Sequence, residues 1–233
     1  PLYSDAVRER SPAWSRDPDD LWFGTGFRTA VIVGNKDAMA DTGLPNFGTL
    51  AEQRFAGQLC LSSSTNQINR TVIAMMIETM DVRPAELAVR GWMKNLARPV
   101  VETEAEVIGA ILSGDCRYGI VSSTAFANTL ADDPGTDLSA IAPDVTFADV
   151  DGVGLARHAR NPEGAAALVE WLFSPDVQEE MASQNRLFPT DEDGASDKAL
   201  ESAGPQNVSP KNVGFVAWHE LAAAQLAERA RYP

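Results

Sequence analysis

The chain has 233 residues, of which 44% are hydrophobic and 22% are charged, enough to bury one large core or two smaller ones. Its 33 acidic residues outnumber 19 basic ones, giving a formal net charge of −14. Such a surface repels phosphate backbones and anionic lipids, which argues against nucleic acid as a partner. No apolar run approaches the roughly 20 residues of a membrane-spanning helix, so we expect no membrane span.

The first part of the chain predicts a short helix, a surface loop and a long strand. Residues 1–20 are polar and contain Pro12, Pro18 and an acidic run, a composition typical of loop after a short helix. From Trp22 to Val33 the sequence WFGTGFRTAVIV is apolar and β-branched, and it ends at Gly34 and Asn35. We therefore predict an extended strand there.

The middle of the chain alternates strand-like and helix-like segments. From Leu44 to about Val150 this alternation is typical of a parallel sheet with crossover helices. Residues 129–149 contain prolines, a glycine and several acidic residues, so we predict a surface loop there. The predicted strands are GQLCLSS and CRYGIVSS, and the predicted helices cover about 67–80, 84–96 and 102–113.

The last part of the chain predicts one strand, three helices and a linker. The strand covers about 152–157, and helices follow at about 162–173 and 175–184. A polar linker from about 190 to 210 leads to an alanine-rich amphipathic helix that ends near Arg231.

Two clusters of hydroxyl side chains stand where a predicted strand ends, each following a cysteine and a short apolar run. At a strand-to-helix junction, free backbone N–H groups and hydroxyls point the same way and hold anions well. Any one of these serines is more simply explained as a helix cap. Two clusters after two strands nevertheless favour one ligand site, because open α/β sheets bind ligands beyond the carboxyl ends of their strands. The first hydroxyl cluster is Ser62, Ser63, Ser64 and Thr65, and the second hydroxyl cluster is Ser122, Ser123 and Thr124.

Cys60 and Cys116 are the only cysteines. Two cysteines in a chain of this length are too few for a disulfide scaffold, so they form either two buried thiols or one bridge. Their spacing alone does not decide between these alternatives.

Catalytic alternatives find little support in the sequence. His158 and His219 are the only histidines, and neither neighbours a nucleophile motif. No G-x-S-x-G, phosphate-loop or dinucleotide motif occurs, and no four-ligand His/Cys metal set can be assembled. We interpret the carboxylate pair Glu104 and Glu106 as part of a solvated face. We therefore expect a binding protein without a resident cofactor and not an enzyme; a serine hydrolase built on Ser62–Ser64 is the weakest alternative.

Several collinear segments carry a further signal. The segments GQLCLSSSTNQINRTVIAMMIETM, WMKNL and AILSGDCRYGIVSS, followed by GVGLARHARNPEGAAALVEWLFSPDVQEEMASQNRLFP, are individually weak motifs in a fixed order. The opening WFGTGFRTAVIVGN has a Trp-x-Gly leading into an arginine. Together they resemble the periplasmic ferric-ion-binding proteins of ABC importers, in particular members with a cysteine in both strands. The resemblance covers nearly the whole chain.

The resemblance implies a class II periplasmic-binding-protein fold. This is an α/β architecture in which two lobes, joined by crossing strands, close on a ligand in the cleft between them. Residues 1–28 would form a partial N-lobe and hinge strand, and 29–150 the C-lobe. Residues 151–205 would form the return segment of the N-lobe, and 206–233 a C-terminal helix packed on the C-lobe. The family's N-terminal segment has no counterpart before Pro1, so we expect a processed, trimmed or partial form of a longer protein.

The resemblance also implies a ligand set that this chain carries only in part. The iron binders place two adjacent tyrosines after the second cysteine strand, because phenolates are hard donors suited to a ferric ion; here those positions are Thr124 and Ala125. Arg28 matches one family arginine, whereas Ala30 replaces an arginine that helps to hold a synergistic anion in some members, and Leu61 replaces a basic residue.

We therefore predict a periplasmic solute-binding protein of an ABC importer that binds iron or a small polar or anionic ligand in an interlobe cleft. A ferric ion with a synergistic anion is one such ligand, and a membrane permease is the expected partner. Arg28 and the two hydroxyl clusters are the predicted ligand residues. The resemblance further implies that Cys60 and Cys116 are bridged in the oxidising periplasm. The alternative is a sensor or binding-null interaction protein that retains the fold.

Overall fold

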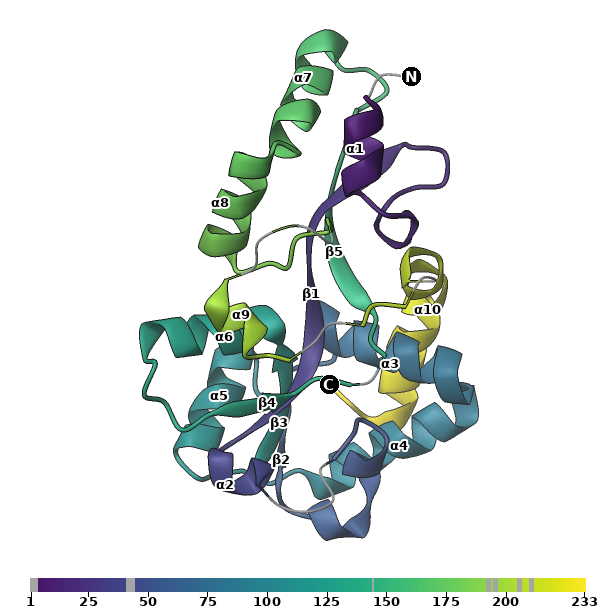
Figure 1. The fold of residues 1–233 in the computed structure, drawn as a ribbon. Helices are drawn as coiled ribbons and strands as arrows, with labels where there is room; N and C mark the ends of the chain where they lie inside the picture. Colours follow the sequence, from purple (N-terminus) through teal and green to yellow (C-terminus); the bar gives the residue numbers. More distant parts are fainter. Residues whose placement is uncertain are drawn as a thin grey trace.

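Strand β1 (Trp22–Gly34) runs through both parts of the molecule and organises them (Figure 1). The computed structural model describes residues 4–40, 45–143, 145–191, 194, 197–204, 207–209 and 212–233. Around the C-terminal half of β1 lies a larger α/β body, which we call the lower body. Around its N-terminal half lies a smaller helical region, the upper part. The predicted strand at 22–33 is confirmed.

The lower body contains a mixed sheet with the strand order β2-β3-β1-β4. The strands β2 (Leu59–Cys60) and β3 (Tyr118–Ser122) are parallel, but β1 is antiparallel to β3 and to β4 (Ser139–Ile141). The prediction of a parallel sheet is therefore wrong beyond the β2–β3 pair. The reason is that β1 enters the lower body from the upper part and runs against the strands that follow it.

Helices cover both faces of this sheet, which explains the continuous apolar run of β1. Ala30 and Ile32 pack into a core shared with one layer of helices, whereas Val31 and Val33 pack into a core on the opposite face. A strand buried on both faces reads as uninterrupted apolar sequence instead of an alternating pattern. The first layer contains α3 (Gln67–Met80), α4 (Val82–Asn95) and α10 (Asn212–Ala230), and the second contains α5 (Glu104–Leu112) and α6 (Ser123–Asp132).

The helices of the lower body begin and end close to their predicted positions. Helix α3 has the predicted bounds, and α5 opens with a capping box in which Thr103 and Glu106 bond each other's backbone amides. The predicted loop at 129–149 is wrong in part, since it contains the end of α6, all of β4 and the start of β5 (Ala148–Gly154). The strand predicted at 152–157 is that same β5, which begins earlier.

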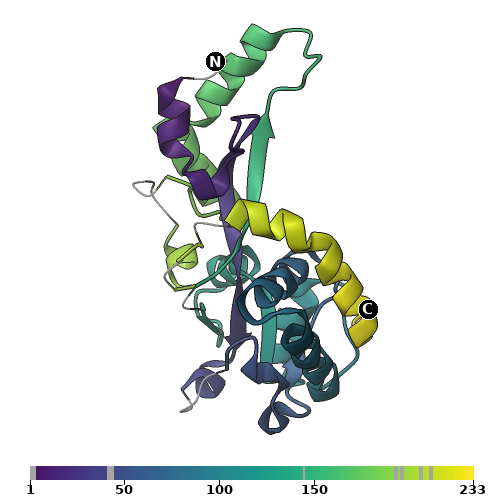
Figure 2. The same ribbon diagram turned by 90° about the vertical axis from the view of Figure 1, so that its right-hand side faces the viewer.

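Three chain segments cross between the two parts: β1, β5 and residues 187–190. Strand β5 pairs antiparallel with the upper half of β1, as Figure 2 shows from the side. The third crossing is formed by residues 187–190, in which Phe188 exchanges backbone hydrogen bonds of 2.9 and 2.8 Å with Phe27. The Phe27 ring stacks on Phe188 at 5.3 Å and meets Trp14 edge-on at 5.0 Å. Aromatic side chains therefore pack together where the two parts are joined.

The upper part is small. It contains α1 (Asp5–Arg10), α7 (Pro162–Leu172) and α8 (Pro175–Asn185), and its described core consists of Val7, Phe23, Val169 and Phe173. The helices predicted at about 162–173 and 175–184 are α7 and α8. The remaining short elements are η1 (Ala13–Ser15), α2 (Lys36–Met39), η2 (Thr49–Ala51), η3 (Gln53–Phe55) and α9 (Lys198–Glu201).

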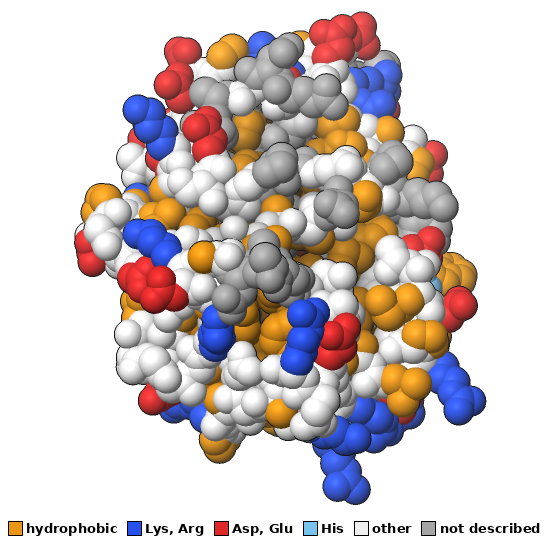
Figure 3. Space-filling view, turned by 60° about the horizontal axis from the view of Figure 1, so that its bottom comes forward, with side chains coloured by type: hydrophobic (Ala, Val, Ile, Leu, Met, Phe, Trp, Pro, Cys, Tyr) orange, Lys and Arg blue, Asp and Glu red, His pale blue; other side chains and the backbone are white. Residues whose placement is uncertain are grey.

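Helix α10 packs against α3 and α4 in the lower body. The division into lobes at residues 28, 150 and 205, with the C-terminal helix on the C-lobe, stays a prediction. The predicted linker at 190–210 lies partly outside the described residues and contains α9. On the face shown in Figure 3, charged side chains of both signs are scattered among apolar and other polar ones. Within the described residues, no helix is both long and apolar enough to cross a bilayer.

Candidate functional site

The two hydroxyl clusters lie at the same edge of the lower sheet. Strands β2 and β3 are parallel, with Leu59 opposite Tyr118 and Cys60 opposite Gly119, so their carboxyl ends point the same way. Along β3, Tyr118 pairs with Gly34 at the end of β1, and Ser122 pairs with Ala30, which is nearer the N-terminal half of β1. The carboxyl end of β3 therefore points toward the upper part. The structure therefore brings the two strand ends to the junction between the two parts, where the sequence predicted a ligand site.

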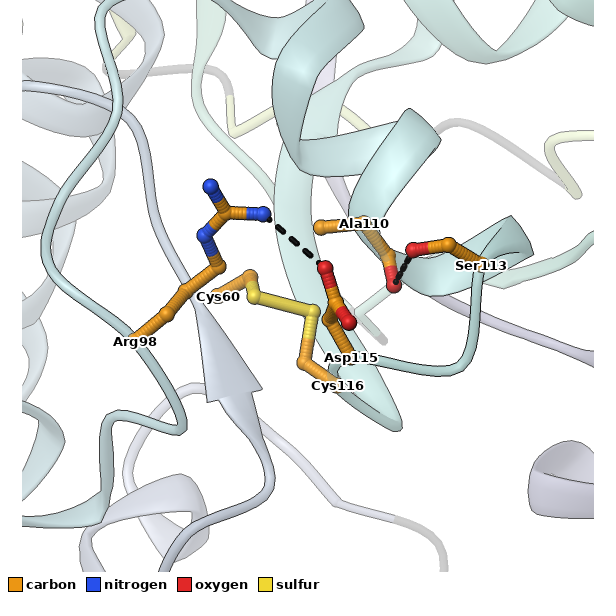
Figure 4. The surroundings of a disulfide bond; sticks show 6 residues. All are labelled: Cys60, Arg98, Ala110, Ser113, Asp115 and Cys116. Carbon is orange, nitrogen blue, oxygen red and sulfur yellow. Dashed lines mark hydrogen bonds and ion pairs between the residues drawn. A yellow bond between two sulfur atoms is a disulfide. The ribbon is translucent and has the colours of Figure 1, made fainter.

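A disulfide joins Cys60 on β2 to Cys116, two residues before β3 (Figure 4). Its Cα atoms are 5.9 Å apart and both cysteines are buried. Arg98 and Asp115 form an ion pair of 3.1 Å beside it. The predicted bridge is confirmed; across a separation of 56 residues the chain-entropy estimate gives it a stabilisation of roughly 4 kcal/mol.

The first hydroxyl cluster divides into one buried serine and three accessible residues. The Oγ atom of Ser62 accepts a hydrogen bond from Asn69 Nδ2 at 2.9 Å, and the side chain is inaccessible to solvent. The Ser63 and Thr65 hydroxyls lie 2.9 Å apart, and the Ser64 amide donates to the Pro233 carbonyl at 2.6 Å. Ser62 therefore has a structural role, whereas the hydrogen-bond donors of the three accessible residues lie near the surface and are bonded within the chain.

A pocket of about 420 Å³ opens beside this cluster. It is lined by Ser64 and Thr65 from the cluster and by two arginines, Arg70 and Arg231; the other lining residues are Ala224, Glu228, Tyr232 and Pro233. The arginines favour an anionic ligand, whereas Glu228 opposes one.

The hydroxyls of the second cluster all have partners within the chain. Ser122 caps α6 through the Ala125 amide at 3.0 Å, and Ser123 Oγ accepts from the Thr29 amide at 3.2 Å. Thr124 Oγ1 donates to the Arg186 carbonyl at 2.8 Å. Capping and tertiary bonds account for these three side chains, so their role as ligand residues stays a prediction.

Glu104 is a member of the site that the sequence did not reveal. Its carboxylate accepts two hydrogen bonds from Ser122, from the amide at 2.6 Å and from the hydroxyl at 2.9 Å. Burial raises the pKa of Glu104 above its ordinary value, although the Ser122 bonds and the charge of Arg28 act in the opposite direction. The interpretation of Glu104 as part of a solvated face is therefore wrong. In the sequence, an acidic residue in the first turn of a helix is explained by its favourable interaction with the helix dipole. The hydrogen bonds of Glu104 to Ser122 could therefore not be inferred from its position.

Arg28 lies on β1 between two aspartates of β5. Its Nη2 atom is 2.7 Å from Asp149 and 3.3 Å from Asp151. Burial would lower the pKa of Arg28, but the two carboxylates outweigh it and raise that pKa, so the guanidinium stays charged. We call Arg28, Glu104, Asp149 and Asp151 the hinge cluster. The alternation in ADVDG, which puts Asp149 and Asp151 on one face of a strand, was the signal available in the sequence.

Neither described tyrosine offers a free phenol group at this edge of the sheet. Tyr118 is buried and donates to the Ala38 carbonyl at 3.1 Å. Tyr232 is buried and donates to the Ser62 carbonyl at 2.6 Å, and burial raises its pKa above the ordinary range. Tyr3 lies outside the described residues. In the part of the chain that the structure describes, no three His, Cys, Asp or Glu residues are grouped so that they could hold a metal ion.

A lower α/β body, a smaller upper part and three crossing segments define a class II periplasmic-binding-protein fold, as predicted. Residues 3–211 match the family described as Bacterial extracellular solute-binding protein, and the chain belongs to this family. The resemblance to iron-binding members, first noted on sequence motifs, is confirmed by the relatives and solved structures that the chain matches.

Two proteins of Synechocystis sp. are among these relatives. Iron uptake protein A1 is 28% identical over 201 residues, which cover 81% of this chain and 55% of that protein. Iron uptake protein A2 is 26% identical over 238 residues, which cover 97% of this chain and 69% of that protein. The chain thus spans little more than half the length of the first relative.

Solved structures match over all or nearly all of the chain. The Trichodesmium protein IdiA (FutA), solved in complex with iron and citrate ligands, has a TM-score of 0.91 and 26% identity, and the match covers 100% of this chain and 77% of that one. The ferric iron-binding protein A of Mannheimia haemolytica, in an open conformation, has a TM-score of 0.89 and 26% identity, with 98% and 75% covered.

Proposed function

We propose that this protein is the periplasmic solute-binding component of an ABC importer and that it carries iron as a complex with a chelating anion. Family membership supports the solute-binding role. Similarity to two iron uptake proteins and to a protein solved with iron and citrate supports the cargo. The protein would deliver this cargo to a membrane permease, without catalysing a reaction.

The observation that carries the choice of an anion-complexed iron is the donor set at the junction. A bare ferric ion needs several anionic oxygen ligands from the protein, yet both described tyrosines are buried and bonded to carbonyl groups. The carboxylates of the junction, Glu104, Asp149 and Asp151, are already bonded to Ser122 or Arg28. The other polar groups there are hydroxyls, a backbone amide and arginines, which are donors to anionic oxygens. An iron that arrives with its own oxygen ligands fits this set.

Binding would close the two parts about their three crossings. Arg28 lies on the crossing strand β1, and the first hydroxyl cluster lies on the edge that faces the upper part. An anion that contacts both would favour the closed form, which a permease recognises.

The test is calorimetric titration of the protein with ferric citrate, citrate, inorganic phosphate and a weakly chelated ferric salt. We expect ferric citrate to bind most tightly and without a visible phenolate-to-iron charge-transfer band. Equal binding of the weakly chelated salt, together with that band, would show direct tyrosine coordination and contradict the proposal. If none of the four binds, the sensor or binding-null alternative is favoured; it already draws support from the Arg28 ion pairs and the internally bonded second cluster.

A further inference from the structure

The chain turns back on itself immediately after α10. Arg231 has a φ of 59°, in the left-handed region. Its amide donates to the Glu228 carbonyl at 3.0 Å, and the Tyr232 amide donates to the Ala227 carbonyl at 2.9 Å. This is the hydrogen-bond pattern of a Schellman motif, in which glycine usually occupies the left-handed position. Here an arginine holds that position, so the turn is less stable than a glycine would make it.

The turn places the following two residues on the first hydroxyl cluster. Tyr232 is 2% exposed and its hydroxyl donates to the Ser62 carbonyl at 2.6 Å. The Pro233 carbonyl oxygen then accepts two hydrogen bonds, from the Ser64 amide at 2.6 Å and from Ser63 Oγ at 3.2 Å. These are two of the donors that an anionic ligand of this cluster would need.

We propose that residues 231–233 form a displaceable latch, which holds the donors of Ser63 and Ser64 until cargo competes for them. This inference rests on the proposed function of the first hydroxyl cluster as part of the cargo site. An oxygen of the bound anion would take the place of the Pro233 carbonyl oxygen, and Arg70 and Arg231 line the pocket into which the anion would enter. The apparent affinity for cargo is then reduced by the fraction of molecules in which the latch is closed.

A matched pair of substitutions at Arg231 tests the latch. Arg231→Gly and Arg231→Val both remove the guanidinium from the pocket, but glycine favours the left-handed turn and a β-branched valine opposes it. We expect the Ser64 amide to exchange its hydrogen faster in Arg231→Val than in Arg231→Gly. We also expect Arg231→Val to bind citrate and inorganic phosphate about three- to tenfold more tightly than Arg231→Gly.

Should Arg231→Val fail to fold, Tyr232→Phe provides a second route, because it removes the hydrogen bond to Ser62 while keeping the ring in the core. The following outcomes would overturn the latch. Ser64 exchange that is equal in all variants would show that the contact does not hold, and faster exchange with unchanged affinity would show that it does not compete. If neither wild type nor any variant binds citrate, phosphate or ferric citrate, the proposed function fails as well. If both Arg231 variants bind with equal affinity, the latch is contradicted but the proposed function is not.

Discussion

At the scale of single residues, the junction between the two parts depends on a partly buried carboxylate. Glu104 holds both the amide and the hydroxyl of Ser122, the residue that caps α6. Because α5 and α6 meet through this contact, Glu104 positions the second hydroxyl cluster relative to the sheet edge. Its protonation state therefore influences the same edge at which the cargo site is proposed.

The pH dependence of stability should reveal this group. A pKa raised in the folded state means that the folded protein binds this proton more tightly than the unfolded chain. The free energy of unfolding therefore falls as pH rises from the ordinary value of 4.5 through the raised pKa. Glu104→Gln removes the titrating carboxyl group, so we expect the urea-unfolding free energy of this variant to fall less than that of wild type across this pH range.

Glu106 is the matched control, because it lies on the same helix but is exposed and its pKa is lowered by hydrogen bonds from Thr103. Its contribution has the opposite sign: it is present above the unfolded pKa and lost as pH falls through the folded pKa. Glu106→Gln should therefore lose stability at neutral pH. Parallel pH curves for wild type and Glu104→Gln would contradict the assignment.

The ion pairs of Arg28 differ in burial, and this sets a second prediction. The Asp149 side chain is 15% exposed and that of Asp151 is 45% exposed. Solvent screens the exposed pair, so we expect Asp151→Asn to change the unfolding free energy by less than about 0.5 kcal/mol. Asp149→Asn should cost about 1–2 kcal/mol. Urea unfolding of both variants at pH 7 tests the order, and equal effects would mean that Arg28 is not held mainly by Asp149.

At the scale of elements, helices were predicted better than strands. Helix α3 has its predicted bounds because its apolar residues repeat at helical spacing. The three-residue strand β4 went unrecognised because it exists through its pairing with β1, with Ile141 opposite Ile32, and not through a local pattern. The hydroxyl clusters and Arg28 could be singled out by residue type, and the alternation in ADVDG was a signal for Asp149. Glu104 and Pro233 could not be recognised as partners of these residues, because tertiary contacts bring them from distant parts of the sequence.

The disulfide gives a third prediction at this scale. It closes a separation of 56 residues, so reduction should lower the melting temperature by about 10 °C, from roughly 4 kcal/mol and the usual entropy of unfolding for a chain of this size. Thermal unfolding with and without a reducing agent tests it. The double variant Cys60→Ala, Cys116→Ala should melt like the reduced protein and not respond to the reducing agent. An unchanged melting temperature for the reduced protein would show that packing alone holds β2 beside β3.

At the scale of the whole molecule, the upper part depends on the lower body. The hydrophobic cluster described in the upper part has four buried residues, while the cluster on each face of the lower sheet is far larger. A core this small cannot offset the entropy of ordering its helices. The upper part is therefore held largely through β1, β5 and the crossing at Phe188. Local sequence patterns did not indicate this dependence, because it arises from how far β1 extends beyond the lower sheet.

Phe188→Ala tests this dependence. The Phe188 ring is 8% exposed and stacks on Phe27, and such a truncation costs about 3–5 kcal/mol in a packed core. Because the loss falls on one crossing, we expect calorimetry to show one transition for wild type and two for Phe188→Ala, with the upper part melting first. Leu168→Ala on α7, where the side chain is 52% exposed, should leave the trace unchanged. A single transition at reduced temperature in Phe188→Ala would show that β1 and β5 suffice to couple the two parts, and that the aromatic crossing contributes stability without setting cooperativity.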